Sequence, residues 1–141
     1  MRIEQNGLEA AIFGLQRLRG RLLNPAPLMQ QIGMMLSNST TERIHTKKSP
    51  DGSVWQPLAH ATIKRKGHDN ILVDKGDLLD SITFSASSWT ARIFSTDQNQ
   101  GKVRGHQFGS DRLPARAIFG LSQGDREDIE NLAVIWMEGA L

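Results

Sequence analysis

The stretch ITFSASSWTARIF, residues 82–94, decides the fold class. Apolar residues alternate with polar ones on both sides of a central Ser-Ser pair, which is the pattern of a β-hairpin with one face buried. Apolar spacings of three or four residues, typical of helices, occur before and after this stretch. The sequence therefore predicts an α+β domain with a small antiparallel sheet. We expect the sheet to extend from about Ile82 to Phe119, with a further strand at 115–121.

Two helices are predicted ahead of the hairpin, because residues 8–22 and 28–39 carry apolar side chains at helical spacing. The prolines of residues 24–27 separate the helices, since proline lacks an amide hydrogen and restricts the residue before it. The second helix begins at Pro27 and runs to about Lys47. We therefore expect residues 1–48 to form a helical hairpin whose two apolar faces pack against other parts of the protein. The apolar face of the first helix consists of Leu8, Ala11, Ile12, Leu15, Leu18 and Leu22, and Arg17, Arg19 and Arg21 fall mostly off it.

The last helix is well marked, from about Gln123 to Gly139. Ser122 can cap it, acidic residues follow where the helix dipole is positive, and an apolar stripe ends in Trp136. Between residue 49 and this helix, the other signals are turns, short helical segments and a loop. They are a turn at 49–52, helical turns at 60–66 and 78–81, and a polar loop at 97–101. Residues 49–141 are the mixed α+β part of one 141-residue domain.

The composition excludes several classes of protein. The chain has no cysteine, so disulfides, thiolate zinc sites and cysteine nucleophiles are excluded. No stretch approaches the ~18 apolar residues needed to span a bilayer. Polar and acidic residues near the N-terminus interrupt any apolar signal sequence. We therefore expect a soluble protein that is made and kept in the cytoplasm.

The charge is unevenly distributed along the chain, although the formal net charge is only +2. Residues 1–66 hold ten Lys and Arg against four Asp and Glu, whereas residues 125–141 hold one Arg against five acids. Three interpretations are open: a solvated surface, pairing of basic and acidic faces between subunits, or binding of nucleic acid by the basic half. The densest basic patch is Lys64, Arg65 and Lys66. It fits a solvated loop best, with a phosphate contact or a protein partner as the alternatives.

No arrangement of residues in the sequence requires catalysis. The four histidines do not pair at a metal-ligand spacing. Asp74, Asp77 and Asp80 recur every three residues, but turn and cap roles explain them better than a cation site. Neither a phosphate-binding loop nor a nucleophile elbow occurs in the sequence. We therefore expect no metal, no cofactor and no enzymatic activity.

One segment, residues 105–122, is unusual. Its GHQFG run at 105–109 suggests a tightly turned backbone. Arg116 follows Pro114 and is suited to hold carboxylates or backbone carbonyls. The residues alone favour a packed corner, with Phe108 buried and Arg116 tying down a loop.

Four pieces of sequence occur in an order that is fairly specific. They are DGSVWQPL at 51–58 with Thr62 and Lys64; Ile71-Leu72 with Gly76-Asp77-Leu78 and Ser81-Ile82; His106-Gln107-Phe108-Gly109; and Leu113-Pro114-Ala115-Arg116 continuing to Gly120-Leu121-Ser122, with Asp125. In this set the chain resembles the phage virion morphogenesis proteins, the tail-completion or head–tail joining proteins of Mu-like contractile-tailed phages. The resemblance covers about residues 50–130. It departs from the family where Lys75 replaces a threonine and where residues 103–105 replace an aromatic-Ala pair.

The resemblance implies a structural protein that acts late in tail or neck assembly and lets the finished tail join a filled head. It implies a homo-oligomeric ring, often hexameric, in the virion neck or tail, assembled in the cytoplasm of the bacterial host. The expected partners are other phage tail or neck proteins, with no membrane and no expected contact with nucleic acid. The alternative is a DNA-binding accessory protein that uses residues 64–66. The candidate interface residues are His106, Phe108, Gly109, Pro114 and Arg116.

A ring subunit needs two different, complementary faces. The basic N-terminal half and the acidic C-terminal helix provide such a pair in the sequence.

Overall fold

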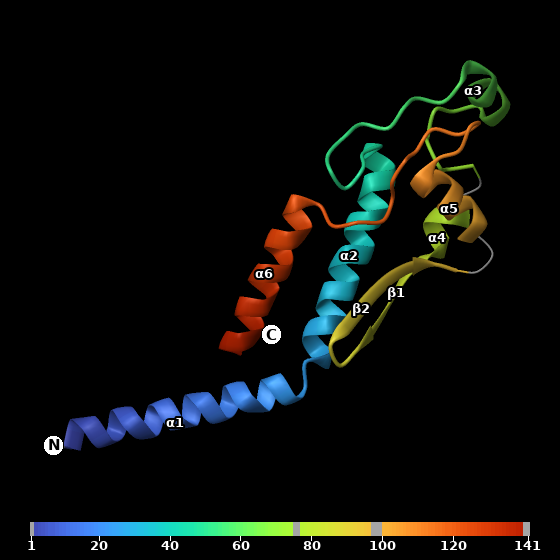
Figure 1. The fold of residues 1–141 in the computed structure, drawn as a ribbon. Coiled ribbons are helices and arrows are strands. Elements are labelled where there is room, and N and C mark those ends of the chain that lie inside the picture. The colour runs from blue at the N-terminus through green and yellow to red at the C-terminus, as the bar shows by residue number, and fades with distance from the viewer. Residues whose placement is uncertain (1, 75–76, 97–99, 140–141) are drawn as a thin grey trace.

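The computed structural model describes residues 2–74, 77–96 and 100–139 (Figure 1). Helices precede and follow a single antiparallel hairpin in the described ranges, which confirms the α+β class. No helix in these ranges is both long enough and apolar enough to cross a membrane. The elements are α1 (Arg2–Leu23), α2 (Ala26–Thr46), α3 (His60–Lys66), α4 (Asp77–Ser81), β1 (Ile82–Ser87), β2 (Thr90–Ser95), α5 (Gln100–Phe108) and α6 (Gln123–Glu138).

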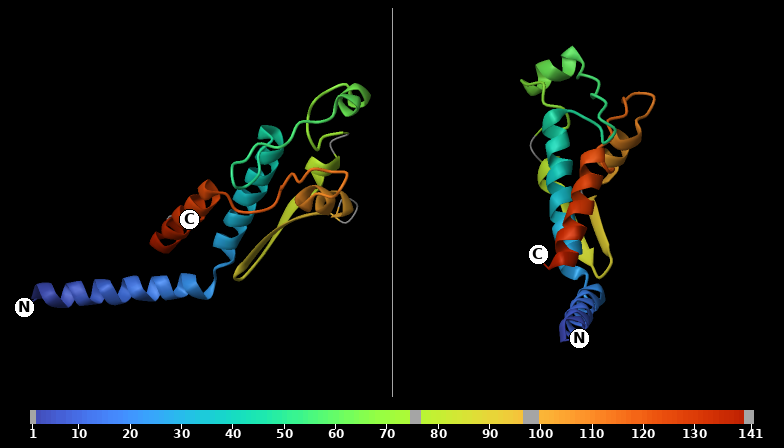
Figure 2. Two further views of the ribbon diagram at one scale, coloured as in Figure 1. Left: turned by 45° about the horizontal axis from the view of Figure 1, so that its top comes forward. Right: turned by 90° about the vertical axis from the view of Figure 1, so that its left-hand side faces the viewer.

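Helix α2 is the centre of the fold, with α6 on one side and the β1–β2 hairpin on the other (Figures 1 and 2). Leu28 and Ile32 of α2 form a buried cluster with Trp136 of α6, because their spacing places them on one helical face. The hairpin approaches α2 so closely that Phe84 lies directly against Gly33. A Cβ atom at Gly33 would stand 2.3 Å from the Phe84 ring, so only glycine fits between the two elements.

A second cluster fills the space between the C-terminal end of α2 and the shorter elements. Its buried members are Ile44, Trp55, Ile71, Leu78, Val103 and Ile118. The predicted turn at 49–52 is present, with the amide of Gly52 donating to the carbonyl of Ser49 over 2.9 Å. The predicted short helices at 60–66 and 78–81 correspond to α3 and α4.

The predicted hairpin is confirmed, and its register pairs Ile82 with Ser95 and Ser87 with Thr90. The prediction that the sheet extends to Phe119 is wrong, because residues 115–121 form no strand. The side chain of Gln107 takes the place of a neighbouring strand there. Its Oε1 accepts from the amides of Ile118 and Phe119 over 2.8 and 2.9 Å, and its Nε2 donates to the carbonyl of Phe119.

Helix α5 was not predicted from the sequence. The sequence interpretation placed a polar loop at 97–101 and a tight turn at 105–109, and it is wrong where the helix forms. Residues 97–99 lie outside the described part, and the helix is formed from Gln100 onward. The tight turn is confined to Gly109, which ends the helix at φ 71°. A Cβ atom there would lie 2.9 Å from the backbone nitrogen of Ala115, so glycine allows the returning chain to pass.

Helix α1 leads away from the rest of the molecule (Figures 1 and 2). The two predicted N-terminal helices are present, but α1 diverges from α2 and its apolar face stays open: Leu8 is 62% exposed and Leu15 is 66% exposed. Its base is fixed at the end of α6, where Arg21 Nη1 donates to the carbonyl of Met137 over 2.7 Å.

Candidate interface around Arg116

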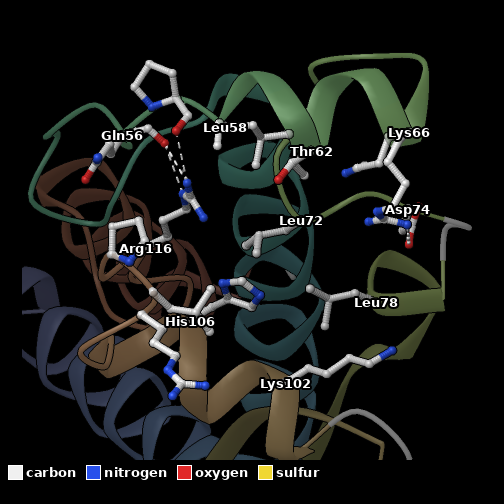
Figure 3. A pocket seen from close by; sticks show the side chains of 16 residues that line it. Gln56, Leu58, Thr62, Lys66, Leu72, Asp74, Leu78, Lys102, His106 and Arg116 are labelled. Atoms are coloured by element: carbon white, nitrogen blue, oxygen red, sulfur yellow. Dashed lines mark hydrogen bonds and ion pairs between the residues drawn. The ribbon is translucent and has the colours of Figure 1, made fainter.

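A cavity of about 410 Å³ lies between α3, α5 and the extended segments near Gln56 and Arg116 (Figure 3). Its walls combine leucine side chains with a surplus of positive charge. This makes the cavity suited to an anionic group that also carries an apolar part. The charged residues of the lining are Arg65, Lys66, Lys102, Arg112, Arg116 and the single acid Asp74, with His106 beside them.

The cavity joins two predicted groups of residues that are far apart in the sequence. His106, Pro114 and Arg116 come from the candidate interface, and Arg65 and Lys66 come from the basic patch. Three predicted residues, Lys64, Phe108 and Gly109, do not line it.

Arg116 binds backbone carbonyls and not a carboxylate, the other partner that its chemistry suggested. Its Nε and Nη2 donate to the carbonyl of Gln56 over 3.0 and 2.9 Å, and Nη2 also donates to Pro57 over 3.2 Å. The residue is only 4% exposed. These bonds hold the segment after Trp55 against the chain that leaves α5 (Figure 3).

His106 lies in the cavity wall on α5, and its carbonyl accepts the amide of Arg116 over 2.6 Å. Its ring Nδ1 is buried and has no hydrogen-bond partner. Burial, and then the nearby positive charge of Arg116, lower the pKa of His106 below its ordinary 6.5. The imidazole is therefore neutral at neutral pH.

The predicted basic patch lies on α3 and is partly neutralised by its own chain. Arg65 Nη1 donates to Asp74 over 3.4 Å, and Lys66 Nζ donates to the carbonyl of Asn70 over 2.8 Å. Burial lowers the pKa of Lys66; Asp74 acts in the opposite direction, and Arg65 and Arg116 add to the lowering. Lys64 is exposed on the same helix.

Phe108 is 75% exposed, so the expectation that it is buried is wrong. The cause is the unpredicted α5, since Phe108 is its last residue and points away from the core cluster. Phe108 instead borders a separate hollow of about 630 Å³ together with Phe94, Arg104 and Phe119.

The sequence interpretation missed a buried ion pair between Arg43 of α2 and Asp125 of α6. Arg43 also donates to the carbonyl of Ile118 and to the hydroxyl of Ser39, which in turn donates to Asp125. Asp125 accepts the amide of Ser122 and completes a capping box with it. Burial alone would raise the pKa of Asp125, but the bonds from Ser39 and Ser122 and the charge of Arg43 hold it below its usual 3.8. Ser39, a polar residue on the apolar face of α2, was the sequence signal that could have indicated this buried polar contact.

Within the described ranges, no three His, Asp or Glu side chains gather as a metal site would require. Of the three regularly spaced aspartates, Asp74 binds Arg65 and Asp80 is exposed. The side chain of Asp77 lies outside the described part of the chain.

These features define an α+β protein with a basic, partly apolar cavity and a projecting helix (Figure 1). The model of the phage virion morphogenesis family matches residues 4–138. The chain therefore belongs to the phage virion morphogenesis family and has a structural or assembly role in forming the phage virion. No curated protein and no solved structure matches it.

Proposed function

We propose that this protein completes the phage tail and makes it competent to join the filled head, acting as a subunit of a homo-oligomeric ring. The observation that carries the proposal is the family match over residues 4–138, which covers almost the whole chain. On this proposal the protein is found at the virion neck or tail and assembles in the bacterial host.

The form of the subunit supports a ring. Helix α1 projects from the body with its apolar face uncovered, as Leu8 and Leu15 show. Residues 1–66 are basic and residues 125–141 are acidic, so the two ends of the chain offer faces of opposite charge. A heterologous interface requires two such different faces on one subunit.

We further propose that the protein is not an enzyme. Among the described residues that line the cavity, Thr62 is the only one with a hydroxyl group, and none of them forms a hydrogen bond with that hydroxyl as a general base would. Incubation with DNA and Mg²⁺ tests this directly, because a nuclease would cleave the DNA and an assembly protein would leave it intact.

DNA binding through residues 64–66 is the competing function. The ion pair of Arg65 with Asp74 reduces the net positive charge available to phosphates, and the Asn70 carbonyl occupies one donor of Lys66. A salt titration separates the two functions, since phosphate binding gives tight association that weakens steeply as salt rises.

Disruption of the gene in its phage, with a plasmid copy for complementation, tests the assembly role. We expect electron micrographs of the lysate to show filled heads and full-length tails that are not joined. Restoring the gene should restore complete particles. Normal virions without the gene, or a lysate without any tails, would contradict the proposed step.

A further inference from the structure

The open apolar face of α1 is explained neither by the cavity nor by the core. Leu8, Ile12 and Leu15 follow one another at spacings of four and three residues, and each is at least 46% exposed. Arg19 is the exception among the three arginines that fall mostly off this face: it lies four residues after Leu15 and so shares the same side of the helix. The arm therefore presents an apolar stripe that carries one positive charge, and Leu22, which is 43% exposed, follows that charge on the same face.

A matching surface exists between α2 and α6. A groove of about 430 Å³ runs between α2 and α6. Its apolar lining is Met34, Met35, Leu132 and Ile135, and Asp128 supplies its one carboxylate. Met34 is 46% exposed and Ile135 is 39% exposed, so the groove is open to a partner.

The spacings of the two surfaces agree when the helices run antiparallel. Arg19, Leu15 and Ile12 are separated by four and then three residues, going backward along α1. Asp128, Leu132 and Ile135 are separated by four and then three residues, going forward along α6. An antiparallel helix in the groove would place Arg19 beside Asp128 while the aliphatic residues meet one another.

The arm cannot occupy the groove of its own subunit. Only Asn24 and Pro25 connect α1 to α2, and the bond from Arg21 to Met137 fixes the base of the arm at the end of α6. The arm then leads away from the body, as Figure 1 and the left-hand view of Figure 2 show. An α1 helix that docks in the groove must therefore come from another copy of the chain.

We propose that α1 of one copy docks antiparallel into the α2–α6 groove of a second copy, with Arg19 paired to Asp128. The second copy is favoured over a different protein because one chain carries both the stripe and its complement in spacing and charge. The contact is head-to-tail, so repeating it links successive copies into a closed ring or an open chain. The inference rests on the proposed ring and identifies the contact that builds it.

The first test compares Leu15→Glu with Phe13→Glu by sedimentation of the full-length chain. Phe13 is a matched control, because it is 59% exposed on the same helix but lies on another face. We expect Leu15→Glu to weaken self-association by ~100-fold and Phe13→Glu by less than ~3-fold. Circular dichroism should show the parent's helix content in both variants.

The second test uses the absence of cysteine in the chain. Two single variants, Ile12→Cys and Ile135→Cys, are mixed and oxidised. We expect a disulfide-linked dimer in the mixture and almost none in either variant alone. Phe13→Cys replaces Ile12→Cys as the control and should not link.

The outcomes separate this inference from the proposed function. Assembly that survives Leu15→Glu, or a mixture that fails to cross-link while the parent assembles, overturns the docking of the arm and leaves the ring standing. A parent chain that stays monomeric at ~100 µM overturns both. Docking as described, with head–tail joining unaffected by Leu15→Glu, supports the contact but overturns its proposed role in joining.

Discussion

Replacing Arg116 tests how the candidate interface is held together. Arg116→Ala removes three charge-assisted bonds to the carbonyls of Gln56 and Pro57. A hydrogen bond to a charged group contributes about 1.5–3 kcal/mol to stability. Gln56 and Pro57 are exposed, so water replaces part of what is lost. We therefore expect a loss of about 3 kcal/mol, which for a domain of this length lowers Tm by ~9 °C.

Arg116→Lys should cause about half that loss, because an ammonium group cannot reproduce a two-pronged contact with neighbouring carbonyls. Arg112→Ala is the matched control: Arg112 lines the same cavity but is exposed. Its removal should change stability by less than ~0.5 kcal/mol. Thermal unfolding of the three variants gives the ranking.

A head–tail joining assay on the same variants then separates stability from interface. If Arg116→Ala and Arg116→Lys both melt like the parent, the contacts to Gln56 and Pro57 do not support the fold and the reasoning is refuted. Normal melting with lost joining would assign Arg116 to a partner contact. A lowered Tm with normal joining at low temperature would mean that Arg116 only stabilises a packed corner of the fold.

Three further perturbations probe the packing and the titrating groups. Asp125→Asn should leave Arg43 buried without a counter-charge and reduce the unfolding free energy measured in urea by about 3 kcal/mol; an unchanged midpoint would contradict the buried pair. Gly33→Ala should cost about 2 kcal/mol in the same assay, because the added methyl meets the Phe84 ring; full stability would show that the hairpin can shift. The lowered pKa of His106 means that the unfolded chain takes up a proton near pH 6.5 before the folded chain does. Stability should therefore fall as the pH drops below about 6.5, and His106→Asn should remove that part of the pH dependence.

Features with local signals were predicted well from the sequence. The capping box of Ser122 and Asp125 marks the start of α6, and its observed end at Glu138 is one residue from the predicted Gly139. The alternating residues of 82–94 likewise specify the hairpin and its turn. In these cases the residues that determine the structure lie within a few positions of one another.

Features that depend on distant residues were not predicted. Residues 115–121 have the composition of a strand, but the side-chain amide of Gln107 pairs with their backbone in place of a neighbouring strand. The link between Arg43 and Asp125 spans 82 positions. Neither pairing has a periodic pattern that the sequence could reveal.

The candidate site was predicted in part for the same reason. The carbonyl-binding use of Arg116 follows from its chemistry, but its partners, Gln56 and Pro57, lie about 60 positions away. The meeting of Arg116 with Lys66 in one cavity depends on how the folded chain brings α3 and the segment after α5 together. The exposure of α1 also depends on tertiary structure, because an amphipathic stripe shows that a helix needs a partner and not where that partner is.

The most direct test of the central proposal is a joining reaction in vitro. Tails from a phage lacking this gene are incubated with the purified protein and then mixed with filled heads, and infectious particles are counted. The proposal predicts that particles form when the protein is added to the tails and that few form without it. Equal numbers of particles with and without the protein would contradict a role in tail completion.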